Sequence, residues 1–189
     1  MLAALHAYSD SELFALMQSA EKHVRDAAFK ELYERFSQRI YAYCLHVLGS
    51  EDEALDIFQE SFIRFYNAAP GTSSQENPSG MLLKIARNLC LNFKRDRKET
   101  VEFEAEHDGI SPCENYENQE LLDLISGALK YLEFEYREAF VLRMMYEMSY
   151  QEISEITGST IHAVRNRVFR AKEKIRIILS PYVVDLERF

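Results

Sequence analysis

Glycine and proline, the residues that most often interrupt helices, are scarce in this chain. The 189 residues include only six Gly and four Pro, and neither occurs before Gly49. Leu, Glu, Ala and Arg, which favour helices, are common. Few interruptions and many helix-forming residues predict an all-α protein.

Acidic residues are concentrated in one segment. Residues 99–120 hold eight Asp and Glu but neither Lys nor Arg, whereas 1–98 and 121–189 are close to neutral. The acidic segment also contains Gly109 and Pro112 and lacks a sustained helical period. We therefore expect two small helical domains, 1–98 and 121–189, joined by an acidic flexible linker. The linker is either a solvated spacer or a functional acidic strand.

Lys and Arg are concentrated in two other segments, one in each expected domain. Residues 84–98 and 165–176 each hold six basic residues and one acidic residue, and both have helical periodicity. The net charge of −9 taken alone argues against a nucleic-acid partner. Two tethered basic helices instead suit a polyanion that is contacted at two separate places.

The cysteines and histidines do not form a recognisable metal or redox motif. Cys44, Cys90 and Cys113 are odd in number and widely spaced, so no disulfide framework is expected. Cys44 with His46, and His107 with Cys113, could be metal ligands, but neither pair has further ligands nearby. Buried or incidental thiols are the favoured interpretation, and we expect no metal and no cofactor.

Motifs of catalysis and of membrane insertion are missing. The sequence has no glycine-rich phosphate loop, no nucleophile elbow and no H-E-x-x-H, which argues against a phosphate-handling enzyme. The first residues lack a basic region followed by a long apolar run, and no stretch approaches 18 apolar residues. We expect a cytoplasmic protein without direct membrane insertion and without enzymatic activity.

Residues 149–176 carry the local signals of a helix-turn-helix. Ser149 and Glu152 have the spacing of a capping box, which satisfies free amides at the start of a helix. Gly158 can adopt the left-handed conformation that ends this helix, and Thr160 is suited to cap the next one. A short helix, a tight turn and a second helix form the arrangement that places a helix in the DNA major groove.

The second of these helices has an apolar face and a basic face. The apolar face is formed by Val164, Val168, Ala171 and Ile175. Early residues of the opposite face would contact bases and later ones phosphates, although a solvated basic helix that packs on another protein is the alternative. The residues expected to contact duplex DNA are Thr160, His162, Ala163, Arg165, Asn166, Arg167, Arg170 and Lys172.

Three helices are expected before the first basic segment: 11–19 capped by Asp10, 25–48 ending at Gly49, and 51–68. The expected core face of the third is formed by Leu55, Phe58, Phe62 and Phe65. A second face of that helix is acidic with one apolar residue, which suits either docking of a basic partner helix or plain solvation. That face contains Asp52, Asp56, Gln59, Glu60 and Ile63.

The breaker-rich segment 67–80 leads into a basic helix, 81–98. A polar loop beside a basic helix suits single-stranded nucleic acid, whose bases can turn out into a pocket, and a solvated loop is the alternative. The residues expected to contact a single strand are Asn67, Lys84, Arg87, Asn88, Asn92 and Arg95.

Four segments together resemble one family. These are ALDIFQESF (54–62), MLLKIARNLCLNFKR (81–95), YREAFVLRMMYEMSYQEISEITG and VRNRVFRAKEKI. Their order, with an acidic segment between the second and third, resembles the bacterial extracytoplasmic-function (ECF) sigma factors, the small two-domain sigma subunits of RNA polymerase. The resemblance covers about residues 10–180.

The resemblance implies roles for these segments. Asp56, Gln59 and Glu60 match the motif that docks on the clamp helices of the largest subunits of core RNA polymerase. The loop 67–80 and the following helix match the region that opens and captures the minus-ten promoter element as a melted single strand. Residues 160–172 match the helix that recognises the minus-thirty-five element as duplex DNA. The linker would thread toward the active cleft, and an anti-sigma factor would be a further partner.

The sequence departs from the family at a few positions. The family usually has Trp at the position of Met81 and Asp at the position of Asn92, and more often Lys and Ser at Arg165 and Asn166. We therefore expect altered packing and promoter preference. A stand-alone helix-turn-helix regulator that binds operators without polymerase is the alternative function.

Overall fold

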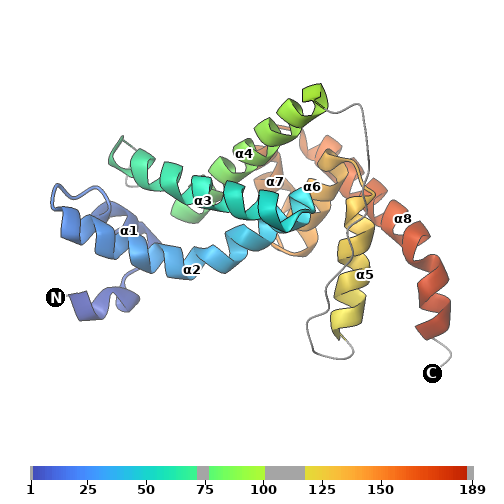
Figure 1. Cartoon of the computed structure of the whole chain (residues 1–189), viewed down its shortest axis with the longest axis horizontal. Coiled ribbons are helices and arrows are strands. Elements are labelled where there is room, and N and C mark those ends of the chain that lie inside the picture. Colours follow the sequence, from blue (N-terminus) through green and yellow to red (C-terminus); the bar gives the residue numbers. More distant parts are fainter. Residues whose placement is uncertain (1, 72–76, 101–117, 187–189) are drawn as a thin grey trace. The chain divides into compact units, whose positions relative to one another are not determined.

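The computed structural model of the chain describes residues 2–71, 77–100 and 118–186, and every element in these ranges is helical (Figure 1). This confirms the all-α prediction. The chain divides into two compact units, Met1–Thr100 and Val101–Phe189. The linker predicted over 99–120 lies largely outside the described residues, so its boundaries and its role stay predictions.

In residues 2–71 and 77–100, the first unit contains four α-helices and two short 3-10 helices. The helices α2 (Lys22–Leu48), α3 (Glu51–Ala68) and α4 (Pro78–Thr100) pack against one another, and α1 (Asp10–Leu16) contacts α2 and α4. The 3-10 helix η1 (Leu2–Ala7) contacts α2, and η2 (Ala69–Gly71) follows α3. The helix predicted at 51–68 is confirmed residue for residue, and Gly49 ends α2 with a left-handed φ of 83°.

Large apolar side chains fill the core of the first unit. The Phe14 ring from α1 stacks on the Phe65 ring from α3 at 5.6 Å, and both side chains are fully buried. Tyr43 and Leu32 from α2 and Leu82 from α4 are buried with them. Cys44 and Cys90 also lie in this core, as expected of buried thiols, whereas His107 and Cys113 lie outside the described residues.

The prediction for the start of the first helix was wrong in one respect. Asp10 was expected to cap it, but the cap is Ser9, whose hydroxyl accepts from the Glu12 amide at 3.3 Å. The Glu12 carboxylate accepts from the Ser9 amide at 2.7 Å, which completes a capping box. The helix ends at Leu16 rather than at residue 19.

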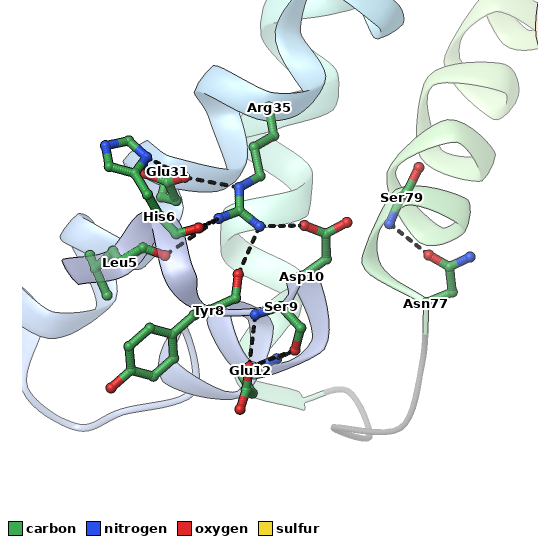
Figure 2. A network of polar contacts seen from close by, with 10 residues as sticks. All are labelled: Leu5, His6, Tyr8, Ser9, Asp10, Glu12, Glu31, Arg35, Asn77 and Ser79. Carbon is green, nitrogen blue, oxygen red and sulfur yellow. Dashed lines mark hydrogen bonds and ion pairs between the residues drawn. The ribbon is translucent and has the colours of Figure 1, made fainter.

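Asp10 instead belongs to a network around Arg35 that ties the N-terminal segment to α2 (Figure 2). Arg35 Nη1 lies 2.8 Å from the Asp10 carboxylate, and Nε lies 2.9 Å from that of Glu31. Glu31 is buried in α2 and is also bonded to His6 Nδ1 at 3.0 Å. The remaining Arg35 hydrogen bonds go to the carbonyl oxygens of Leu5, His6 and Tyr8.

The described part of the second unit, residues 118–186, contains α5 (Asn118–Lys130), α6 (Phe134–Met144), α7 (Tyr150–Thr157) and α8 (Ile161–Leu186). The helices α5, α6 and α7 all contact α8. The predicted apolar face of α8 is confirmed, because Val164, Val168, Ala171 and Ile175 are all buried. Buried Arg137 donates to the carbonyl oxygens of Lys130 and Leu132, which satisfies groups left free at the end of α5.

Candidate functional site

The acidic face of α3, formed by Asp52, Asp56, Gln59, Glu60 and Ile63, faces outward. Asp52, Asp56 and Gln59 are exposed, and the Ile63 side chain is 56% exposed. The opposite face of the helix is buried through Phe58, Phe62 and Phe65. The packing of α3 therefore holds these polar groups and one apolar side chain in solvent.

Leu55 was predicted to lie in the core of α3, and this was wrong. Its side chain is 44% exposed. Leu55 lies at the margin of the buried arc, one turn before Gln59 and two turns before Ile63, so the three form a ridge at i, i+4 spacing. The outward face is consequently more apolar than the sequence analysis allowed.

Glu60 differs from its neighbours because it has an internal partner. Arg64 Nε lies 2.6 Å from the Glu60 carboxylate, one helical turn away, and both side chains are partly exposed. This pair neutralises Glu60, so the free negative charge of the face lies at Asp52 and Asp56.

The basic helix α4 begins with a well-defined cap. The Asn77 side-chain oxygen accepts from the amides of Ser79 and Gly80 at 3.1 and 3.3 Å, and Pro78 occupies the first helical position (Figure 2). The cap fixes the direction in which the chain enters α4 after the segment that follows Gly71.

The predicted single-strand contacts lie mainly on the outer surface of the first unit. Asn67 is exposed near the end of α3, and Lys84, Asn88 and Asn92 are exposed on α4. Arg87 is half-buried, and Arg95 is exposed 3.5 Å from the Asp96 carboxylate. The inner face of α4 is buried, with Leu82, Leu83, Ala86, Leu89 and Cys90 in the core. Met81 is half-buried, so it contributes part of its side chain to packing.

The helix-turn-helix signals of the second unit are confirmed. Ser149 caps α7, and its hydroxyl accepts from the Glu152 amide at 3.2 Å, while the Glu152 carboxylate accepts from the Ser149 amide at 2.7 Å. Hydrogen bonding from the Ser149 side chain, and next from the Ser149 amide, holds the pKa of Glu152 below its ordinary value because it favours the charged carboxylate. Gly158 ends α7 with a φ of 66°, and the Thr160 hydroxyl accepts from the Ala163 amide.

The turn between α7 and α8 is braced by side-chain hydrogen bonds. The Ser154 hydroxyl donates to the Ser159 carbonyl oxygen at 2.6 Å. Arg167 Nη1 donates to the Ser159 hydroxyl at 2.8 Å, and the Arg167 side chain is only partly exposed. Arg167 was expected to contact DNA; in this structure its guanidinium bonds to the turn.

The outer face of α8 presents the other residues predicted to contact duplex DNA. Thr160, His162, Arg165 and Asn166 are exposed at its start, with Ala163 half-buried beside them. Arg170 and Lys172 are exposed one turn later. The Phe169 side chain lies on the same face and is 59% exposed. The face is therefore basic with an apolar centre.

Sequence analysis missed Tyr150, which begins α7. The guanidinium carbon of Arg143 lies 5.0 Å from the centre of the Tyr150 ring, and that of Arg165 lies 5.4 Å from it. Tyr150 is partly exposed. Its only sequence signal is its place after the capping serine, which does not reveal that two arginines from other helices converge on it.

In the described part of the chain, no helix is long and apolar enough to cross a lipid bilayer. The sequence is similar to known proteins along most of its length. It is 30% identical over 163 residues to the ECF RNA polymerase sigma factor SigW of Bacillus subtilis, an alignment that covers 79% of this chain and 87% of SigW.

The chain belongs to the ECF RNA polymerase sigma factors. Residues 32–100 match the family model of sigma-70 region 2, and residues 122–175 match that of sigma-70 region 4. The ECF sigma factor SigE of Mycolicibacterium smegmatis is 29% identical over 167 residues, which is 82% of this chain and 63% of that protein. As a sigma factor, the chain acts in transcription initiation with core RNA polymerase and promoter DNA, and the stand-alone regulator is not favoured.

Two solved structures share the fold of this sigma factor. One is the sigma factor RpoE in complex with the anti-sigma factor NepR from Bartonella quintana, with a TM-score of 0.71 and 24% identity, covering 80% of this chain and 96% of RpoE. The other is CnrH in complex with the cytosolic domain of CnrY, with a TM-score of 0.66 and 22% identity, covering 91% of this chain and 97% of CnrH.

Proposed function

We propose that this sigma factor docks on the clamp helices of core RNA polymerase through the outward face of α3. The carboxylates of Asp52 and Asp56 would pair with basic groups of the polymerase helix. The apolar ridge of Leu55 and Ile63 would be buried on contact, and Gln59 would supply a directional hydrogen bond. The observation that carries the proposal is that exposed acids and exposed apolar residues share one helix face.

The two basic helices would then contact promoter DNA at separate places. Asn67 and the outer face of α4 would hold the melted strand of the minus-ten element, with Lys84, Arg87 and Arg95 supplying positive charge and Asn88 and Asn92 hydrogen bonds. The start of α8 would enter the major groove of the minus-thirty-five element, with Arg165 and Asn166 near base edges and Arg170 and Lys172 at phosphates.

This role requires no chemistry from the sigma factor itself. Polymerase would catalyse RNA synthesis in the cytoplasm, while this subunit would select the promoter and help to open it. RpoE was solved in complex with the anti-sigma factor NepR, and CnrH was solved in complex with the cytosolic domain of CnrY. We therefore also propose an anti-sigma factor as a partner of this chain.

Docking is tested by the substitution Asp56→Arg, which places a positive charge where the partner helix is basic. We expect the variant to keep its helical content and to lose co-purification with core polymerase. Glu34→Arg makes the same charge change at an exposed position of α2, and this variant should still bind core polymerase. Equal binding by Asp56→Arg and the wild type would contradict the docking assignment.

Duplex binding is tested by Arg170→Ala in the holoenzyme. We expect affinity for a promoter duplex to fall about tenfold, whereas Arg176→Ala, further along α8 and paired with Glu173, should change it less than about threefold. A loss confined to one base position would indicate base recognition, and a loss independent of sequence would indicate phosphate contact. If Arg170→Ala loses no affinity, whether at one base position or independently of sequence, Arg170 does not contact the duplex.

A further inference from the structure

Three helices of the second unit meet at the ring of Tyr150. Tyr150 is the first residue of α7, Arg143 belongs to the last turn of α6, and Arg165 belongs to the first turns of α8. Both guanidinium groups lie within 5.4 Å of the same ring centre. This is the range in which a cation is attracted by the electron-rich face of an aromatic ring.

Hydrogen bonds fix the backbone before Tyr150 and the Arg143 side chain beside its ring. Arg143 Nη1 donates to the Met148 carbonyl oxygen at 2.7 Å, so the Arg143 side chain has a fixed anchor two residues before Tyr150. The Ser149 and Glu152 capping box immediately before the ring fixes the backbone at the start of α7. Tyr150 therefore offers its ring, on an anchored backbone, to a side chain that approaches from α8.

Arg165 is the side chain that benefits from this surface. It is exposed near the start of α8, and a solvent-exposed arginine ordinarily samples many rotamers. Ordering such a side chain when DNA binds costs conformational entropy. Contact with the Tyr150 ring restricts Arg165 before DNA arrives, which removes part of that cost.

We propose that Tyr150 is a positioning residue that holds the Arg165 guanidinium ready to contact promoter duplex DNA. The proposal rests on the proposed role of α8 in duplex binding. It goes beyond that role because it states that a ring on another helix orients the Arg165 side chain. The hydroxyl of Tyr150 is not required for this function, because the ring face makes the contact.

The test is a double-substitution cycle in the reconstituted holoenzyme. The probe is a labelled duplex that the wild-type holoenzyme selects from a pool with a randomised upstream region. Tyr150→Leu should weaken duplex binding about threefold to tenfold in the wild-type background. In the Arg165→Ala background the same substitution should weaken it less than about twofold, since the positioned group is gone. Tyr150→Phe should bind as the wild type does.

A second measurement keeps the proposal testable even if Tyr150→Leu folds poorly. In the free full-length protein, the Arg165 Nε–H resonance should carry a ring-current shift in both the wild type and Tyr150→Phe. An unshifted resonance in the wild type would overturn the proposal.

The outcomes separate this proposal from the one on which it rests. Equal losses from Tyr150→Leu in the two backgrounds, with Arg165→Ala itself weakening binding, would overturn the positioning role alone. A Tyr150→Phe variant as weak as Tyr150→Leu would do the same. Unchanged binding by Arg165→Ala would overturn both the positioning role and the assignment of Arg165 to duplex DNA.

Discussion

Arg35 Nη1 lies 2.8 Å from the Asp10 carboxylate, and this contact joins the second helix of the chain to the first residue of α1. The same guanidinium neutralises Glu31, whose side chain is only 8% exposed. The hydrogen bond to Asp10 is the largest cause that raises the pKa of Arg35, and Glu31 also raises it, because both carboxylates stabilise the charged guanidinium. One side chain thus holds η1, α1 and α2 together.

Replacing Arg35 with Met should strongly destabilise the first unit. The substitution deprives the Glu31 carboxylate of its guanidinium partner and leaves it with His6, so we expect the free energy of unfolding to fall by more than it does in Arg64→Met. Arg64→Met is the matched control, because Arg64 also pairs with a glutamate one turn away, but in solvent. It should cost less than about 1 kcal/mol. Equal losses in urea unfolding would contradict this account of the network.

The capping hydrogen bond of α7 should be measurable by a pair of serine substitutions. Ser149→Ala removes a hydroxyl that accepts from the Glu152 amide, and we expect it to cost about 1 kcal/mol of stability. Ser50 caps α3 without a side-chain hydrogen bond, so Ser50→Ala should cost less than about 0.5 kcal/mol. Thermal melts followed by circular dichroism compare the two, and a larger loss at Ser50 would contradict the assignment of the caps.

The turn of the helix-turn-helix requires a glycine for its backbone conformation. Gly158 has a φ of 66°, and an added Cβ would meet no other atom within 4 Å. Gly158→Ala should therefore cost about 1–2 kcal/mol through backbone strain alone. Gly71 has equally open surroundings and no positive φ, so Gly71→Ala should be close to neutral. Comparable destabilisation by both variants would argue against strain as the cause.

His46 should make the stability of the protein depend on pH. Burial near the end of α2 lowers the pKa of His46 below 6.5, because the charged imidazolium loses hydration there. The unfolded chain therefore takes up this proton at a higher pH than the folded chain, and the free energy of unfolding falls as pH drops through 6.5. Urea unfolding at pH 7.5 and about 5.5 should show a smaller loss in His46→Gln than in the wild type. The same loss in both would exclude His46 as the source.

Local signals in the sequence were sufficient for most of the helices. The capping pair Ser149 and Glu152, the helix-ending Gly49 and Gly158, and the apolar period of α8 each depend on residues close together in the chain, and the structure confirms them. The face of α3 was also identified from periodicity, apart from Leu55. Whether a residue at the margin of a buried arc is buried or exposed depends on how the neighbouring helix packs, and periodicity does not specify that packing.

Contacts between distant residues were beyond sequence analysis. The Asp10–Arg35 ion pair is one example, since its partners are 25 residues apart. The Ser9 cap is different, because Ser9 and Glu12 have the same capping-box spacing as Ser149 and Glu152 and this local signal was overlooked. Arg167 has the charge of a DNA contact, but its hydrogen bond to Ser159 emerges only when the turn is folded. The convergence of Arg143 and Arg165 on Tyr150 likewise requires three helices to be packed. Composition and hydrophobic periodicity describe one helix at a time, whereas these contacts join residues of different elements.

The central claim is tested most directly by reconstitution of transcription. Core RNA polymerase free of any sigma subunit is incubated with fragmented genomic DNA from the source organism, with and without this protein, and the 5′ ends of the transcripts are mapped. We expect transcripts that start at defined positions only when the protein is present, and their loss with Asp56→Arg. Identical transcripts with and without the protein would contradict the account.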